Sequence, residues 1–203
     1  MKVKVCGLTR RSDVELACEL GASHVGFVLV PETPRFVSAQ HVRHLAGDLP
    51  SHVEPVLVFR NPSRSFVQDA VDISGVRTVQ IFHHEEPMAR TFEAQGLRVH
   101  RVSAAPPPSA PLFSFQPKPG PSRIWHIDIA GGGTGRTFDW TLLGSEAPRF
   151  VFVAGGITPR TVDRLLAHDP WGIDFSSGVE SCPGIKDPDR LRSMFRRIEE
   201  VTA

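Results

Sequence analysis

The stretch FVFVAGGITPRTVDRLLAHDPWGIDFSSG, residues 150–178, decides the fold class. Two short apolar runs, each long enough for one buried strand, flank a segment whose apolar residues recur at helical spacing. Thr158 is placed to cap this helix, and Pro159 is placed in its first turn. A strand, a helix and a second strand in this order predict two parallel strands joined by a helical crossover.

The same alternation of short apolar strands and amphipathic helices continues toward both ends of the chain. Eight strands that alternate with helices favour a (β/α)₈ TIM barrel. A doubly wound open sheet is the alternative, but no G-x-G-x-x-G follows the first strand. The expected strands are 3–8, 24–30, 54–60, 76–82, 97–103, 123–130, 149–156 and 172–177. The expected helices are 11–22, 38–49, 63–74, 85–96, 138–147, 158–169 and 187–201.

One segment interrupts this alternation of strands and helices. Residues 106–121, PPPSAPLFSFQPKPGP, contain seven prolines, and proline inside a helix removes a backbone hydrogen bond. We therefore expect a proline-rich loop in place of the fifth helix. We expect Phe113, Phe115 or both to pack on the barrel wall that a helix would otherwise cover; the alternative is a wholly disordered loop that leaves this wall open to water.

Length and composition limit the possible classes of protein. With 203 residues, 40% of them hydrophobic, the chain is expected to form a single domain over 1–203. Its 23 basic and 22 acidic residues predict no nucleic-acid partner. No apolar run is long enough to span a bilayer and no signal peptide is evident, so a cytoplasmic protein without membrane contact is expected. Three widely spaced cysteines predict no disulfide framework, and the absence of metal-binding motifs predicts no metal and no cofactor.

A barrel of this class carries its active site at the carboxyl ends of its strands. Cys6 and Asp128 lie near the ends of predicted strands, and Arg35 follows a predicted strand. Taken singly, each has an ordinary structural explanation, as a buried thiol, a surface arginine and a turn carboxylate. The last two strands end in small residues at the place where barrel enzymes commonly bind phosphate, although such residues can also simply form tight turns. These residues are Gly155, Gly156, Ser177 and Gly178.

A thiol and a carboxyl group on opposite sides of a substrate can act as base and acid. For this, the pKa of Cys6 is expected to fall so that some thiolate forms. The pKa of Asp128 is expected to rise so that the acid keeps its proton. No histidine lies close enough in the pattern to form a Cys–His nucleophile, so proton transfer is favoured over acyl transfer.

Taken in order, the motifs resemble the phosphoribosylanthranilate isomerases of tryptophan biosynthesis. The resemblance covers nearly the whole chain. It rests on KVCGLTR (4–10), GFVLVPETPRFVS (26–38), VLVFRN (56–61), HIDIAGGGTGRTFDW (126–140), FVAGGITP (152–159) and DFSSGVESCPGIKD (174–187).

This resemblance implies a barrel that converts N-(5′-phosphoribosyl)anthranilate to 1-(2-carboxyphenylamino)-1-deoxyribulose 5-phosphate by an Amadori rearrangement. It implies that Cys6 is the general base, acting at C2′ of the ribose, and that Asp128 is the general acid, acting at the ring oxygen. It also implies that Arg35 binds the anthranilate carboxylate and that Gln80 contributes to substrate binding. The phosphate would bind near Gly155, Gly156, Ser177 and Gly178. The expected partner is a small-molecule substrate, with the chain a monomer or a homodimer.

The chain departs from the family pattern after the fourth strand. Where the family has Val-Gln-Leu-His-Gly-x-Glu, this chain has VQIFHHEE, so Phe82 and His83 replace histidine and glycine. Two alternatives stay open at this point. One is a sugar-phosphate isomerase of histidine biosynthesis, which would carry an aspartate in place of Cys6. The other is a barrel that binds a phosphate ligand without turnover.

Overall fold

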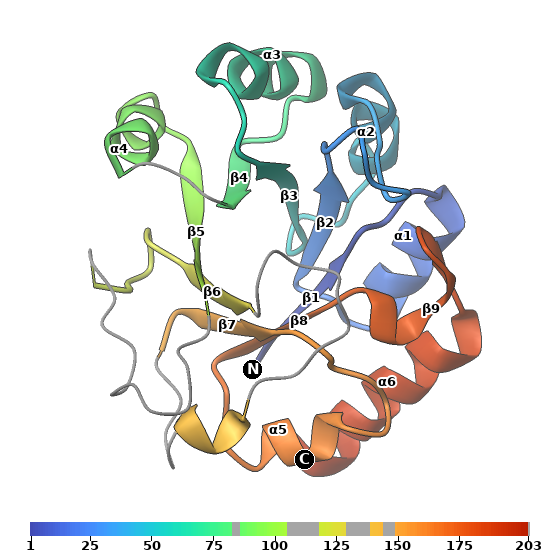
Figure 1. Ribbon diagram of the computed structural model, residues 1–203. Coiled ribbons are helices and arrows are strands. Elements are labelled where there is room, and N and C mark those ends of the chain that lie inside the picture. Colours follow the sequence, from blue (N-terminus) through green and yellow to red (C-terminus); the bar gives the residue numbers. More distant parts are fainter. Residues whose placement is uncertain (83–85, 105–117, 129–138, 144–148, 203) are drawn as a thin grey trace.

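The computed structural model describes residues 1–82, 86–104, 118–128, 139–143 and 149–202. Eight parallel strands close into a barrel in the order of the sequence, with β8 hydrogen-bonded to β1. The helices lie outside this ring of strands (Figure 1). The predicted (β/α)₈ fold is confirmed. The barrel strands are β1 Lys2–Cys6, β2 His24–Val28, β3 Glu54–Arg60, β4 Thr78–Phe82, β5 Arg98–Ala104, β6 Trp125–Asp128, β7 Val151–Ala154 and β8 Gly172–Phe175.

The connecting elements differ in length. They are α1 Arg11–Glu19, α2 Ala39–Ala46, α3 Arg64–Ser74, α4 Glu86–Ala94, the 3₁₀ turns η1 Trp140–Leu143 and η2 Ser177–Val179, α5 Val162–Leu166, the short strands β9 Glu180–Cys182 and β10 Ile185–Lys186, and α6 Pro188–Thr202. Ser38, the first residue of the expected helix 38–49, caps α2, because its hydroxyl accepts a hydrogen bond from the backbone N–H of His41. Gly96, the last residue of the expected helix 85–96, follows α4 with a φ of +80°, a conformation that favours glycine and ends the helix.

Two helix predictions were wrong in their details. Thr158 does not cap α5, because the chain first makes a turn in which the Thr158 hydroxyl accepts a hydrogen bond from the N–H of Arg160. The helix begins only at Val162, so it is shorter than the predicted 158–169. In the predicted helix 138–147, the structure describes 139–143, and Trp140–Leu143 form the 3₁₀ turn η1. The carboxylate of Asp139, just before this turn, accepts hydrogen bonds from the backbone N–H and the hydroxyl of Thr141. The local side-chain bonds favour turns over an α-helical start.

The predicted loop at 106–121, with Phe113 and Phe115, lies mostly outside the described residues. So do His83, Glu85 and the glycine-rich residues 131–135. Of the proline-rich segment the structure describes 118–121, where Gly120 forms an isolated bridge with Arg123.

The barrel interior below the pocket is unusually polar. His24, His100 and His126 surround the ring of Phe152, which lies 4.8 Å from the His126 ring and stacks on it at 22°. Gly172 leaves room for this phenyl ring, since a Cβ there would come within 2.7 Å of it. Burial lowers the pKa of His24 to about 3 and also lowers the pKa values of the other two, so these histidines are neutral at physiological pH. These three buried histidines are therefore polar but add no positive charge beneath the pocket.

Candidate active site

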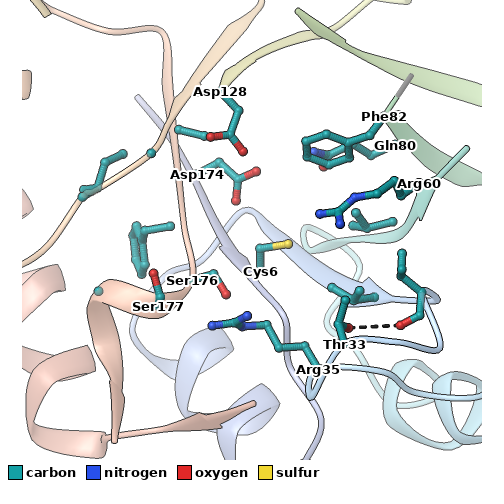
Figure 2. A pocket seen from close by; sticks show the side chains of 18 of the residues that line it. Cys6, Thr33, Arg35, Arg60, Gln80, Phe82, Asp128, Asp174, Ser176 and Ser177 are labelled. Carbon is teal, nitrogen blue, oxygen red and sulfur yellow. Dashed lines mark hydrogen bonds between the residues drawn. The ribbon is translucent and has the colours of Figure 1, made fainter. Parts of the chain in front are cut away.

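A cavity opens at the carboxyl ends of the strands, as expected for this class of barrel (Figure 2). All of the residues predicted from the sequence to form the site line this one cavity. They come from strands and loops at both ends of the chain, which barrel closure brings together. The lining includes Cys6, Arg35, Gln80, Asp128, Gly155, Gly156, Ser177 and Gly178.

Cys6 lies at the end of β1 and faces Gly26 of β2, its partner in register. A side chain at position 26 would crowd both groups, because its Cβ would lie 2.8 Å from the Cys6 sulfur and 3.1 Å from Nζ of Lys4. Figure 2 shows the thiol near the centre of the site, with Asp128 and Asp174 across the cavity from Arg35. The thiol and the Asp128 carboxyl group thus line a shared space in which a substrate could lie between them.

The expected lowering of the Cys6 pKa was wrong. Burial, the largest effect, raises the pKa of the Cys6 thiol above its ordinary value, and the charge of Asp174 acts in the same direction. Lys4 and Lys186 oppose this rise without overcoming it. The protein therefore holds the thiol mainly in its protonated form at neutral pH.

Arg35 is held in place by an acidic residue that the sequence analysis did not identify. Its Nε and Nη2 atoms donate to the two carboxylate oxygens of Glu180, at 2.9 and 2.6 Å. Lys186 Nζ also donates to Glu180 Oε1, at 2.8 Å. Burial favours a higher pKa for Glu180, but Arg35 and Lys186 together hold it below its ordinary value, so the group is a carboxylate. This bidentate pair fixes the plane of the guanidinium and leaves its Nη1 group available to a ligand.

The predicted phosphate-binding residues form a cradle of closely packed backbone. Gly155 and Gly156 follow β7 with φ angles of +94° and +62°, which side-chain-bearing residues rarely adopt. Gly178, in η2, packs against the loop after β7, where an added Cβ would lie only 1.9 Å from the carbonyl oxygen of Ile157. Glycine at these positions lets backbone N–H groups approach the oxygen atoms of an anion.

Two buried oxygen atoms in the lining residues have no hydrogen-bond partner in the part of the chain that the structure describes. They are Oε1 of Gln80, on β4, and Oδ1 of Asp174, on β8. A buried acceptor without a partner is costly in free energy, and in a binding site it indicates a donor on the ligand. Hydroxyl groups of a sugar are donors of this kind.

Several side chains of the site were missed by the sequence analysis. Arg60 ends β3 and lines the cavity, with its guanidinium turned inward (Figure 2). The position of Arg60 at a strand end was the signal that could have identified it. Phe82, noted above as a departure from the family pattern, ends β4 and also lines the cavity. Lys4 and Asp174 could have been found as charged residues within apolar strands, at positions that share a face with the strand-end residues Cys6 and Ser176.

The described residues contain no group of three histidine, cysteine or acidic side chains arranged to hold a metal ion. Among the helices that the structure describes, none has both the length and the apolar character needed to cross a bilayer.

Comparisons with known proteins agree with this geometry. The model of the N-(5′-phosphoribosyl)anthranilate isomerase family matches residues 3–197. An enzyme of that name from Leptothrix cholodnii is 37% identical over 207 residues, covering 100% of this chain and 92% of its own. The crystal structure of phosphoribosyl anthranilate isomerase from Thermus thermophilus superposes with a TM-score of 0.86 at 29% identity, covering 99% of this chain and 100% of its own. A crystal structure of such an isomerase in complex with reduced 1-(o-carboxyphenylamino)-1-deoxyribulose 5-phosphate has a TM-score of 0.79 at 26% identity, covering 98% of this chain and 99% of its own.

Proposed function

The chain belongs to the N-(5′-phosphoribosyl)anthranilate isomerase family, and we propose that Cys6 and Asp128 are the base and the acid of its reaction. The reaction converts N-(5′-phosphoribosyl)anthranilate to 1-(2-carboxyphenylamino)-1-deoxyribulose 5-phosphate in tryptophan biosynthesis, as an aldose–ketose isomerisation. The observation that carries the assignment is that the thiol and the carboxyl group line one cavity from different strands.

The order of proton transfers follows from the chemistry of the rearrangement. Asp128 donates a proton to the ribose ring oxygen, the C1′–O bond breaks, and the ring opens to a protonated imine. The Cys6 thiolate then removes the proton from C2′, and the electron pair of that C–H bond moves toward the imine to give an enolamine. Tautomerisation of the enolamine gives the ketone product. General acid–base help of this kind typically contributes about 10² to 10⁴ in rate.

The remaining groups of the pocket would bind the two anionic ends of the substrate and its hydroxyl groups. The Nη1 side of Arg35 suits the anthranilate carboxylate, because Glu180 already occupies the Nε side. The backbone at Gly155, Gly156, Ser177 and Gly178 suits the phosphate. The unpartnered oxygens of Gln80 and Asp174 suit the sugar hydroxyls.

The activity is tested by complementation together with an assay of the purified chain. We expect the chain to restore growth of a tryptophan auxotroph that lacks this isomerase, and to consume phosphoribosylanthranilate with loss of its fluorescence. Growth rescue of a histidine auxotroph alone would instead favour the histidine-pathway isomerase. Binding of the substrate without turnover would favour the non-catalytic barrel.

Arg35→Ala should weaken binding of an anthranilate-bearing product analogue by about 10- to 150-fold, since a hydrogen bond to a charged group is worth about 1.5–3 kcal/mol. Titration calorimetry with that analogue measures the change. Arg43→Ala, on the exposed surface of α2, is the matched control and should leave the affinity unchanged. Equal affinities for the Arg35→Ala variant and the parent would remove Arg35 from the carboxylate site.

The raised pKa of Cys6 predicts the direction of the pH dependence. Because the base must be a thiolate, kcat/KM should rise with pH from about pH 7 to beyond pH 9, until the thiol is ionised. Initial rates across this range at fixed ionic strength give the profile. A plateau reached already below neutral pH would show that the ionisation of this buried thiol does not limit the reaction.

A further inference from the structure

Lys4 lies two residues before Cys6 on β1, and alternate residues of a strand share one face. Both side chains therefore project into the barrel. Their ends converge over Gly26 of the neighbouring strand, since a Cβ on that glycine would meet the Cys6 sulfur at 2.8 Å and Nζ of Lys4 at 3.1 Å. The missing side chain of Gly26 thus creates the space in which an ammonium group stands beside the thiol.

Lys4 remains charged although its side chain has no exposed surface. It is opposite Asp174 in the register between β1 and β8, and its Nζ donates to Asp174 Oδ2 at 2.8 Å. Burial alone would lower the pKa of Lys4, but the charges of Asp174 and Cys6 raise it above its ordinary value. A buried ammonium without such a partner would lose its proton.

Asp174 is itself held by a neutral histidine. His126 Nδ1 lies 3.0 Å from Asp174 Oδ2, and His126 Nε2 lies 3.1 Å from His100 Nδ1. Because Asp174 is a carboxylate, His126 donates from Nδ1, and its Nε2 accepts the hydrogen of His100 Nδ1. With both histidines neutral in these tautomers, every hydrogen bond from His100 on β5 through His126 and Asp174 to Lys4 on β1 has a donor and an acceptor. No further charge is needed.

Other charged groups also face Cys6 from the surrounding elements. Arg35 and Lys186 share the single carboxylate of Glu180, which compensates for one of their two positive charges. Lys4 differs from them because its ammonium reaches the space beside the sulfur, while Asp174 binds it from the β8 side. The charged and titratable groups around the thiol are Lys4, Arg35, Arg60, Asp128, Asp174, Glu180 and Lys186.

We infer that Lys4 is a positioning residue for the base: its buried ammonium, fixed by Asp174 and His126, stabilises the Cys6 thiolate as it forms. The inference rests on the proposed role of Cys6. It explains how a thiol in a buried site can supply enough thiolate to act, because burial alone would suppress ionisation further.

The test measures ionisation of Cys6 separately from turnover. The rate of iodoacetamide alkylation of the Cys6 peptide in the folded full-length chain is followed by mass spectrometry across pH. In Lys4→Met the midpoint should move up by about 1 pH unit or more, so that alkylation slows about 10-fold near neutral pH. A purely structural role for Lys4 would leave the alkylation midpoint of the folded variant at the parent value.

Two further variants act as controls. Lys4→Arg should keep a midpoint near that of the parent, and so should Lys2→Met, which removes an exposed lysine from the same strand. In the single variants at Lys4 and Lys2, the rising part of the kcat/KM profile should follow the alkylation midpoint, with KM little changed. If Lys4→Met does not fold, the double variant Lys4→Met, Asp174→Asn leaves no unpaired charge and should still have a raised midpoint.

A midpoint in folded Lys4→Met, or in the double variant, at or below that of the parent would overturn the inference. The role of Cys6 as the base is tested by a separate result, the turnover of Cys6→Ser. If the midpoints move as expected but Cys6→Ser keeps its turnover, Lys4 still controls the thiol and the assignment of Cys6 as the base fails.

Discussion

Cys6→Ser and Asp128→Asn should each lower kcat by about 10²-fold or more, with the barrel intact. A serine hydroxyl in place of the thiol is a far weaker acid, so almost no anion would be present to remove the C2′ proton. An asparagine at position 128 keeps the shape of the side chain but has no proton to transfer to the ring oxygen. Both changes remove groups that act mainly in the transition state, so kcat should fall much more than KM rises.

The chain offers matched controls for both variants. Cys182→Ser changes an exposed thiol, and Asp69→Asn changes an exposed carboxylate on α3. Each should keep the parent kcat. Circular dichroism and the thermal midpoint would establish that the active-site variants are folded. Near-parent kcat in both folded active-site variants would mean that the reaction uses other groups.

The fold could be predicted because it depends on features that are local in the sequence. Short apolar runs, helical spacing and glycine stops such as Gly96 identify the units one at a time, and their number is that of a closed barrel. The site residues could be predicted for a related reason. In a parallel barrel every strand ends at the same rim, so Cys6, Asp128 and Gly178 had to meet once the fold was known.

The partners of these residues could not be predicted, because they are fixed by long-range closure. Lys4 and Asp174 are 170 positions apart and become neighbours only when β8 joins β1. Arg35 and Glu180 are separated by 145 positions. The direction of the Cys6 pKa shift could not be predicted for the same reason. Sequence shows a thiol in a strand, but its depth and its nearest charges belong to the closed barrel.

Gly178→Ala should lower kcat/KM by about 10²- to 10⁴-fold, mainly through weaker substrate binding. The new methyl group would overlap the Ile157 carbonyl, whose oxygen lies 1.9 Å from the Cβ position, and Thr158 Cα is also close at 3.2 Å. Both obstacles are backbone, so the loop after β7 and the turn η2 must separate. These two segments carry the proposed phosphate cradle. Losing two charge-assisted bonds to phosphate costs about 3–6 kcal/mol, which corresponds to this range.

Gly120→Ala is the matched control, because a Cβ at Gly120 meets no atom within 4 Å among the described residues beyond its chain neighbours. It should leave both kcat/KM and the thermal midpoint close to those of the parent. Inorganic phosphate gives a readout that does not depend on turnover. Its inhibition constant should rise at least 10-fold in Gly178→Ala, since it would bind the same cradle. The contrary result would be that phosphate and substrate bind folded Gly178→Ala as tightly as they bind the parent. In that case the close packing of the loops after β7 and β8 does not position the anion, and the phosphate must bind elsewhere in the pocket.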